Sequence, residues 1–532
     1  MRHLKNKNLP IIIILSTFLI IGIAIYADYG ISWDEPYHRI NGFVSLNFLR
    51  KIFFLDIYPG LEHDSSFLAE NSKMYGVLFD LPMAFIEKKL LIEDPKNYFL
   101  FRHFFNFFIF FISCIFFYLI LKKRFSDKLS IIGLLFLILT PRIFAESFYN
   151  MKDILFLSLF IISLFYAINF IDELSYKNAF LSGLFCALAI SVRVLAIIVP
   201  FIVIFFFILS ALDKNKFLRD NIYKLIIFSF SLFIFTILFW PYLWTDPLTN
   251  FITTLKSMSS YQWRGGIFYL GNYISGLNLP WHYPIVWVSV STPIIYLLLF
   301  FLGSLLILFK IFSNFLNLSN NNQTNNLWSG NKERMDIIFF IIFYSTIFLV
   351  IKINATLYGG WRHLYFIYPC LIFVSIRGLE FISKMLAQKY LIFFIIPFLL
   401  YTSIWMFNNH PYQFAYFNIF AGKNLQNNFE IDYWGVSNKS SLNFIANNTS
   451  KKVSVYVLSS SPYQFSLPML DERERSKIAF VSNLENADFL VTNHYYQKGN
   501  PIEINKNLGK KFELIKEFKV DDIPINSIYK TK

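Results

Sequence analysis

Residues 104–121 read FFNFFIFFISCIFFYLIL, and the basic triplet Lys122-Lys123-Arg124 follows directly. Together with the residues from 99 onward, this apolar stretch has the length of about 20 residues that a helix needs to cross a bilayer. Lysine and arginine directly after such a stretch are typical of a helix that ends at the cytoplasmic face. The stretch therefore predicts a membrane-spanning helix.

The composition of the whole chain agrees with this prediction. Of its 532 residues, 56% are apolar and only 15% are charged, whereas soluble domains carry about 25% charged residues. An ordinary cytosolic enzyme and a disordered chain are both excluded. The net charge of +14 is attributed to membrane topology, and no nucleic-acid partner is expected. The three cysteines lie in apolar runs and suggest neither a metal site nor a disulfide framework.

Eleven stretches have the length and apolarity of membrane-spanning helices. They lie near residues 9–27, 99–121, 129–145, 152–171, 177–192, 194–212, 222–240, 285–310, 335–352, 362–379 and 388–406. The stretches between 129 and 212 follow one another closely, so their limits stay open. The first stretch is long for a signal peptide and lacks a clear cleavage site, so we expect an uncleaved anchor.

Positive charges orient these spans. If the N-terminus is cytoplasmic, the basic clusters at 122–128, 214–224 and 377–389 also fall on the cytoplasmic side. An odd number of spans then places the C-terminal segment outside, in the periplasm or the extracellular space. The prediction is a polytopic α-helical membrane protein with a transmembrane module over residues 1–406 and outer loops at 28–98 and 241–284.

The segment 407–532 is more polar than the rest of the chain. Its β-type runs at 452–458, 477–481 and 488–492, with a closing pair at 512–520 and 523–529, alternate with short helical stretches. This pattern favours a small extracytoplasmic α/β domain.

The predicted topology gathers acids and cations from four separate loops on the outer face. Ionisable residues at a membrane boundary need partners or a function. The candidate site residues are Asp34 and Glu35 after the first span, Arg142, Glu146, Asn150, Lys152 and Asp153 between spans three and four, Arg193 between spans five and six, and Tyr358, Trp361, Arg362 and His363 before span ten.

Each group has a simpler explanation when it is considered alone. Asp34 and Glu35 fit an N-cap or a solvated loop, and Arg142 and Lys152 fit cations that extend their charge toward the interface. Trp361-Arg362-His363 fits an aromatic anchor at the membrane surface, and Arg193 fits a structural ion pair. Their shared location favours a common function.

Transfer of a sugar from a lipid phosphate needs the acids, cations and aromatic side chains that gather on this face. A carboxylate can remove the proton of the acceptor hydroxyl as it attacks the anomeric carbon. Arginine, lysine or a metal ion can stabilise the departing phosphate. Aromatic rings such as those of Trp263, Tyr269, Trp281 and Trp361 could stack on sugar faces.

These residues also carry a resemblance. The Asp34-Glu35 pair after a first span resembles membrane glycosyltransferases of the GT-C superfamily, close to the protein O-mannosyltransferases and aminoarabinose transferases (glycosyltransferase family 39). The resemblance covers residues 1 to about 406. A bacterial branch of these proteins is similar in four motifs, namely Pro141-Arg142…Glu146…Asn150-Met151-Lys152-Asp153, Tyr358-Gly359-Gly360-Trp361-Arg362-His363, His410-Pro411-Tyr412-Gln413 and Asp432-Tyr433-Trp434-Gly435.

The resemblance implies a hexosyl- or pentosyltransferase of the bacterial inner membrane that uses a polyprenyl-phosphate sugar donor. It implies that Asp34 is the catalytic base, that Glu35 shapes the site, and that the donor phosphate is bound by residues among Arg142, Lys152, Arg193, Arg362 and His363. The acceptor would be a lipid, a glycan or a protein. The Lys-Pro-Pro stretch of the lipid A-modifying members is missing, since the nearest region reads Asn71-Ser72-Lys73-Met74-Tyr75-Gly76, which argues against that acceptor.

Two questions stay open at this stage. A divalent cation held by Asp34 with Glu146 or Asp153 is an alternative to the cationic side chains, and we favour a metal-independent site. A transporter or flippase for lipid-linked saccharides is the alternative function. Transporters place polar groups near the bilayer midplane in repeated halves, whereas here the charges gather at one face and no repeat is visible.

Overall fold

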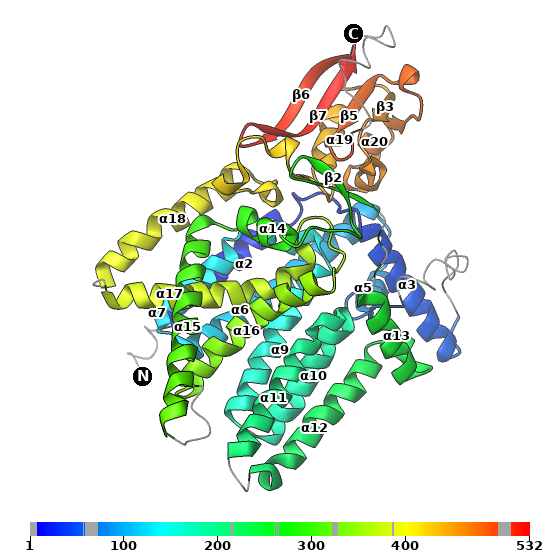
Figure 1. Ribbon diagram of the computed structural model, residues 1–532. Coiled ribbons are helices and arrows are strands. Elements are labelled where there is room, and N and C mark those ends of the chain that lie inside the picture. Colours follow the sequence, from blue (N-terminus) through cyan, green and yellow to red (C-terminus); the bar gives the residue numbers. More distant parts are fainter. Residues whose placement is uncertain are drawn as a thin grey trace.

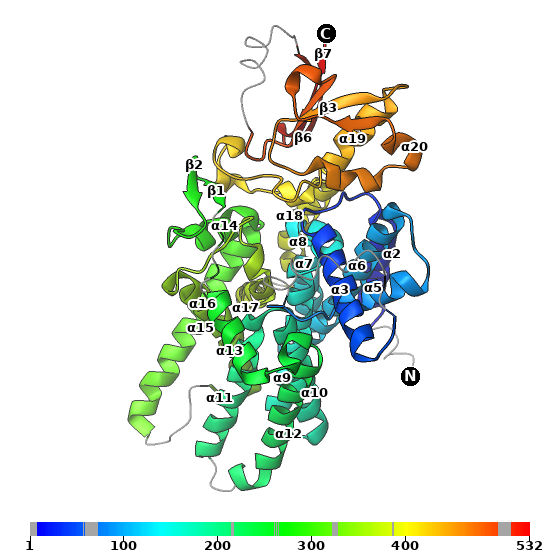
Figure 2. The same cartoon turned by 90° about the vertical axis from the view of Figure 1, so that its right-hand side faces the viewer.

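The computed structural model describes residues 8–56, 58, 73–213, 217–259, 261, 263, 265–321, 328–385, 388–497 and 512–532. The chain forms a bundle of apolar helices, and its C-terminal strands gather at one end of the bundle (Figure 1). Figure 2 shows the same arrangement from the side, with the helical hairpins extending away from the strands. It is a multi-pass membrane protein.

Each of the eleven predicted stretches overlaps an apolar helix or a bent pair of helices. These are α2 (Leu9–Ile25), α6 (Pro95–Arg124), α7 with α8 (Asp127–Ile138 and Pro141–Tyr149), α9 (Asp153–Asp172), α10 (Tyr176–Val192), α11 (Ile198–Asp213), α12 (Phe217–Leu238), α15 (Ile294–Asn321), α16 (Asn331–Lys352), α17 (Tyr368–Met385) and α18 (Gln388–Asn408). The stretch 285–310 begins in the short helix α14 (Tyr283–Ser291) and continues in α15. Within the described residues, seven helices are long and apolar enough to cross a membrane, or eight with the bent pair. The count of eleven is therefore not confirmed.

The predicted third span, 129–145, is not one helix. Helices α7 and α8 meet at an angle of 61°, and the break falls at Thr140, whose backbone is extended. The next residue is Pro141, and the residue before a proline is disfavoured in the helical conformation. The break gives α8 a direction of its own, and every residue of α8 is buried.

Ion pairs show that helices α6 and α9 run in the same direction and that α16 runs in the opposite one. The C-terminal end of α6 meets the start of α16, where Arg124 Nε lies 2.7 Å from Asp336 Oδ1. Asp172, at the end of α9, pairs with Lys123 and Arg334 at this same end of the bundle. At the other end, Lys96 near the start of α6 lies 2.7 Å from Asp471 of the C-terminal segment. Helices α6 and α9 thus run in parallel, as the predicted topology requires.

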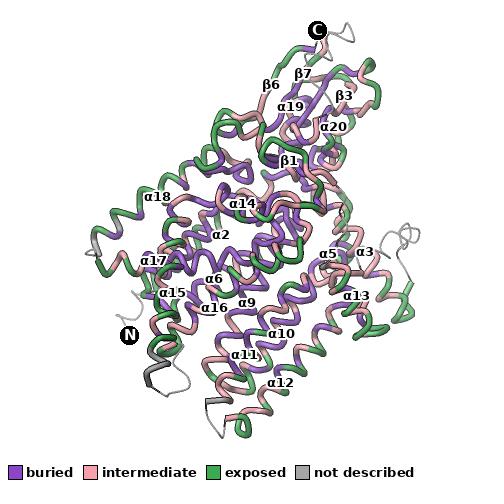
Figure 3. The backbone as a smooth tube through the Cα atoms, viewed as in Figure 1, coloured by how far each residue is buried: buried purple, intermediate pink, exposed green. Residues whose placement is uncertain are grey.

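Burial separates the inner helices from those that face lipid. Figure 3 shows α9 largely buried and α12 and α18 with long exposed stretches. In its apolar window α9 is 78% buried, whereas α12 is only 11% buried. Beyond the charged first turn of α12, most of its exposed side chains are apolar, as at Phe230 and Phe233, which suits a surface in contact with acyl chains.

The two long loops predicted to lie outside, called the outer loops below, fold onto the end of the bundle that carries the strands. The first contributes α3 (Glu35–Ile52) and α5 (Asp80–Lys89). The second contributes η2 (Pro241–Trp244), α13 (Pro247–Ser259), the hairpin β1 (Gly266–Tyr269) and β2 (Asn272–Ser275), and α14 (Tyr283–Ser291).

The C-terminal segment forms the small α/β fold that its sequence predicts. Its five-stranded sheet has the order β4-β3-β5-β7-β6, and α19 packs against it through Leu442 and Ile445. Strands β3, β4 and β5 are parallel, and β7 joins β5 antiparallel. The elements are α19 (Asn438–Asn447), β3 (Val453–Val457), α20 (Glu472–Arg475), β4 (Ile478–Phe480), β5 (Phe489–Thr492), β6 (Phe512–Val520) and β7 (Ile523–Thr531).

The link between bundle and sheet is tightly bonded. The carboxylate of Asp432 accepts hydrogen bonds from the backbone N–H groups of Val436 and Ser437, both at 3.1 Å. Trp33 N donates to Trp434 O at 3.1 Å, and Lys439 Nζ donates to Ala27 O at 2.6 Å. These bonds hold the start of the first outer loop between the bundle and the sheet.

Candidate active site

Four chain segments bring charged side chains to one place beneath the C-terminal sheet. Asp34 precedes α3, Asp153 begins α9, Arg193 ends α10, and Arg362 begins the short helix η3 (Arg362–Ile367). Arg362 Nη1 lies 3.0 Å from Asp153 Oδ2 and 3.5 Å from Asp34 Oδ2. Arg193 donates to the other oxygen of Asp153. The four predicted residues therefore form one continuous network.

The two carboxylates of this network differ in exposure. The Asp153 side chain is 1% exposed and lies between two arginines, so its charge is compensated within the protein. The Asp34 side chain is 35% exposed and contacts only one of these arginines. Asp34 is thus the carboxylate that a ligand can reach, and Asp153 holds the arginines in position.

The turn between α8 and α9 fixes Asp153. Asn150 Nδ2 donates to Glu146 Oε2 at 2.6 Å and to Asp153 Oδ2 at 3.1 Å. Asn150 Oδ1 in turn accepts from the backbone N–H of Asp153 at 3.0 Å. Tyr365 OH donates to the second oxygen of Glu146 at 2.7 Å. Glu146 and Asn150 therefore hold the Asp153 carboxylate in position through hydrogen bonds.

Glu35 faces away from this network. Its side chain is fully buried, with His103 Nε2 2.9 Å from Oε2 and Ser32 N 2.6 Å from Oε1. Glu35 thus attaches the first outer loop to α6. His103 escaped the sequence analysis, although a histidine inside an apolar span is a signal for a buried polar partner.

Lys152 lies next to the network, at the edge of a small cleft. Its Nζ atom is 3.0 Å from the ring centroid of Tyr75, and the cleft is also lined by His38, Asn41 and Asp80. Burial, with the charge of Arg193 nearby, lowers the pKa of Lys152 to about 7. The lysine is poised between its charged and neutral forms near physiological pH.

An aromatic frame surrounds Arg362. Its guanidinium carbon lies 4.7, 5.3 and 4.5 Å from the rings of Tyr358, Tyr433 and Trp434. Gly359 has φ +63°, and a Cβ there would lie 2.9 Å from the Tyr433 ring. The Gly-Gly pair after Tyr358 thus lets the chain pass close to Tyr433. Tyr433 and Trp434 were predicted only as part of the resemblance.

Two predicted residues, Arg142 and Trp361, lie away from the network, whereas His363 lies beside it. Arg142 Nε donates to Tyr416 O at 3.0 Å, and its guanidinium carbon lies 4.4 Å from the Phe417 ring. Trp361 Nε1 donates to Ser291 Oγ at 2.7 Å. The ring of His363 packs edge-on against Tyr358 at 4.6 Å. Arg142 and Trp361 thus bind neighbouring helices and loops rather than Asp34.

A second charged cluster lies behind α3. Arg39 Nη2 is 2.5 Å and Arg102 Nη2 is 3.6 Å from the buried carboxylate of Glu87. Asp80 Oδ2 lies 3.2 Å from His38 Nδ1. These pairs join α3, α5 and α6, and so hold the helix that begins at Asp34. Sequence analysis missed them because their partners are far apart in the chain.

Two of the three carboxylates considered as cation ligands, Asp153 and Glu146, are bonded within the protein. The carboxylate of Asp153 pairs with Arg193 and Arg362. The carboxylate of Glu146 accepts hydrogen bonds from Asn150 and Tyr365. Among the described residues, no group of three or more histidine, cysteine, aspartate or glutamate side chains could hold a metal ion.

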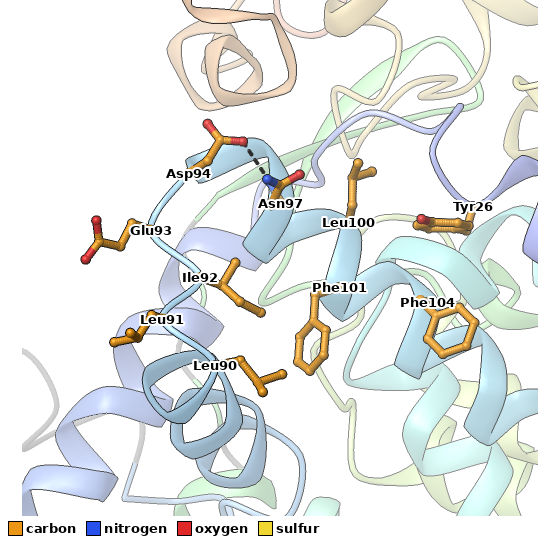
Figure 4. Close-up of a pocket in the computed structure, with 10 residues that line it drawn as sticks. All are labelled: Tyr26, Leu90, Leu91, Ile92, Glu93, Asp94, Asn97, Leu100, Phe101 and Phe104. Atoms are coloured by element: carbon orange, nitrogen blue, oxygen red, sulfur yellow. Dashed lines mark hydrogen bonds between the residues drawn. The ribbon is translucent and has the colours of Figure 1, made fainter.

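An open groove of about 650 Å³ lies between α5 and the start of α6. Figure 4 shows Leu90, Phe101 and Phe104 along it, with Glu93 and Asp94 on the connecting loop. None of the predicted site residues lines this groove. It is a feature of the first outer loop and is separate from the charged network.

Comparison with known proteins links part of the chain to a family. The family model described as dolichyl-phosphate-mannose-protein mannosyltransferase matches residues 102–240. This segment runs from α6 to the end of α12 and contains Lys152, Asp153 and Arg193. The match confirms the predicted resemblance to membrane glycosyltransferases of the GT-C superfamily.

Several solved structures are similar to the whole chain at low identity. The ArnT structure from Cupriavidus metallidurans in the apo state has 9% identity, a TM-score of 0.46, and covers 97% of both chains. The same protein bound to undecaprenyl phosphate has 10% identity, a TM-score of 0.46, and 98% coverage of both. The apo oligosaccharyltransferase from Archaeoglobus fulgidus has 11% identity and a TM-score of 0.43, covering 89% of this chain and 65% of that chain. No curated protein matches by sequence.

Proposed function

We propose that this membrane protein transfers a sugar from a polyprenyl-phosphate donor to an acceptor hydroxyl, with Asp34 as general base. The observation that carries the proposal is the network in which a reachable carboxylate, Asp34, lies 3.5 Å from Arg362 Nη1. Arg362 and Arg193 share the buried Asp153 behind it. Acceptor activation and phosphate stabilisation thus have their groups side by side.

The chemistry is a single displacement. The acceptor oxygen attacks the anomeric carbon while its proton passes to an oxygen of Asp34. The bond between the anomeric carbon and the phosphate oxygen breaks, and its electron pair stays on the lipid phosphate. Arg362, Arg193 and Lys152 would stabilise the charge that develops there. Because attack and departure occur on opposite sides of the carbon, the product is inverted.

An apolar groove suits the lipid part of the donor. It encloses about 360 Å³ between α10, α11, α12 and α13, and nearly all its lining is apolar, including Phe201, Leu232 and Phe251. Ile190 and Ile197, which also line it, flank Arg193 in the chain. A polyprenyl tail in this groove would bring its phosphate toward Arg193.

A bulky side chain placed in this groove should weaken binding of long-chain donors and leave binding of short-chain donors unchanged. Leu232→Trp is expected to raise KM for a long-chain polyprenyl donor about tenfold, since losing two buried methylene contacts costs about 1.6 kcal/mol. A donor shortened to a few isoprene units should be transferred as by the wild type. Ile234→Trp, on an exposed face of the same helix, is the matched control. Equal KM values for both variants with the long donor would contradict this assignment.

Lys152 gives the reaction a pH dependence. The charged ammonium, which is the form that binds phosphate, predominates below the pKa of about 7. We therefore expect kcat/KM for the donor to fall as the pH rises through about 7, because this ratio follows the ionisation of the free enzyme. Lys152→Arg should remove this decline, since arginine stays charged. The measurement is initial transfer rates between pH 6 and 9, and the same decline in the variant would exclude Lys152.

The remaining features of the proposal follow from the charge pattern of the sequence. The N-terminus would be cytoplasmic, and the site and C-terminal sheet would face the periplasm of a bacterial inner membrane. The position of the charges at the end of the bundle supports transfer rather than transport, since a transporter needs its polar groups near the midplane. The acceptor would be a lipid, a glycan or a protein.

Direct transfer tests the proposal. Purified protein in lipid nanodiscs is incubated with radiolabelled polyprenyl-phosphate sugars and extracted cell-envelope material. Label in envelope material, with inverted configuration at the sugar carbon, is the expected result. Movement of labelled donor across liposome membranes without any transfer would instead support a flippase.

A further inference from the structure

A second polar cleft lies between the β1–β2 hairpin and the C-terminal sheet. It encloses about 100 Å³ and opens to solvent on one side. Its lining comes from the hairpin, from the link before the sheet, and from the segment after β5, namely Phe268, Tyr273, Glu430, Asn493, Tyr495 and Tyr496 with their neighbours.

Glu430 is the unusual residue of this cleft. Its side chain is only 8% exposed, and Oε1 accepts from the backbone N–H of Phe268 at 3.0 Å. Oε2 is buried and has no hydrogen-bond partner among the described residues. Burial raises the pKa of Glu430 to about 8, so the group is a neutral acid at pH 7. An unsatisfied buried polar atom costs about 1–3 kcal/mol, and a ligand hydroxyl would relieve this cost.

The rest of the lining is aromatic or already bonded. The rings of Tyr273 and Tyr496 stack at 5.2 Å, and Phe268 lies 4.9 Å from Tyr273. His494 is bonded on both ring nitrogens, to Gln497 and Ser527. In the described part of the chain, no lysine or arginine lines the cleft. Such a lining suits a neutral ring with hydroxyl groups and does not favour phosphate or a carboxylate ligand.

The cleft is joined to the charged network through aromatic contacts. Tyr495 packs edge-on against Tyr433 at 5.7 Å and against Trp33 at 5.8 Å. Tyr433 in turn lies 5.3 Å from the guanidinium carbon of Arg362. A ligand in the cleft is therefore separated from the network by one layer of aromatic side chains.

We propose that this cleft is a carbohydrate-binding subsite, which holds a neutral hexopyranose unit with its face on the tyrosine rings and a hydroxyl on Glu430. The bound sugar unit would be part of the acceptor, an assignment that rests on the proposed transfer reaction. An acceptor sugar held here would be adjacent to the Asp34 region, on the side of the C-terminal sheet.

Binding is measured on the full chain in nanodiscs, without any turnover. The probes are the methyl glycosides of glucose, galactose, mannose and N-acetylglucosamine, and the readout is saturation-transfer-difference NMR. At least one probe should give a signal with wild type. Glu430→Leu and Tyr496→Ala should each abolish the signal, whereas Glu430→Gln should keep it, because an amide replaces a neutral acid. Phe420→Ala, an exposed ring outside the cleft, is the control.

The outcomes separate this inference from the proposed function. No signal with any probe, or a signal that survives both Glu430→Leu and Tyr496→Ala, overturns the subsite. Asp34→Asn should bind the probe as wild type does, even though it would not transfer sugar. If the cleft variants lose the probe signal but keep the wild-type KM for the acceptor, the cleft binds sugar and its assignment to the acceptor is wrong.

Discussion

Asp34→Asn is expected to lower the rate of sugar transfer by about 10²- to 10⁴-fold, the contribution typical of a general base. Asparagine has nearly the same shape and keeps a side-chain oxygen facing Arg362, but it cannot take up the acceptor proton. Because Asp34 is 35% exposed and its removal leaves Arg362 paired with Asp153, the midpoint of unfolding should stay close to that of the wild type.

The measurement combines transfer of labelled sugar with unfolding of the same preparations. Glu93→Gln is the matched control, since Glu93 is an exposed carboxylate of the same outer loop and lines the separate groove near α5. This variant should keep the wild-type rate. An unchanged rate in Asp34→Asn would remove Asp34 as the base. Among the nearby carboxylates, Glu146 and Asp153 are already committed to internal bonds.

The sequence predicts where the charges gather, but not which of them meet. Apolar lengths and basic clusters place Asp34, Asp153, Arg193 and Arg362 on one face, and the structure joins these four. This succeeds because hydrocarbon thickness and charge asymmetry are strong constraints on where each span ends. The direction of a side chain depends instead on local backbone breaks.

Arg142 and Glu35 illustrate this limit. The break at Thr140 turns 141–149 into a separate buried helix, and Arg142 points to the backbone of Tyr416. Neighbouring residues at the start of a helix point in different directions, so Asp34 reaches Arg362 while Glu35 reaches His103. Contacts with residues 274 and 68 positions away decided the two cases.

Glu430 shows a different limit. It lies in the stretch Phe429 to Tyr433, where apolar and acidic residues alternate, a pattern in which an exposed acid is ordinary. Its burial results from packing of the β1–β2 hairpin, about 160 residues earlier in the chain, as the bond from Phe268 N records. A buried acid created by such a distant contact has no local sequence signal.

Asp153→Asn is expected to lower the stability of the protein strongly, whereas Asp34→Asn should leave the stability nearly unchanged. Asp153 is 1% exposed and compensates Arg193 and Arg362, which are 12% and 2% exposed. Removing one partner of a buried ion pair typically costs roughly 3–5 kcal/mol, because the other charge stays buried without compensation. The midpoint of SDS-induced unfolding in mixed micelles should fall clearly below that of Asp34→Asn.

A second substitution tests whether uncompensated charge is the cause. In Asp153→Leu with Arg193→Met, one negative and one positive charge are removed together, and Arg362 keeps its contact with Asp34. Replacing a buried ion pair by apolar groups is often neutral or stabilising, so the double variant should recover most of the lost stability. It should still transfer sugar slowly, because Arg362 would lose the carboxylate that positions it. If the double variant is as unstable as Asp153→Asn, packing around Asp153 rather than its charge holds this end of the bundle together.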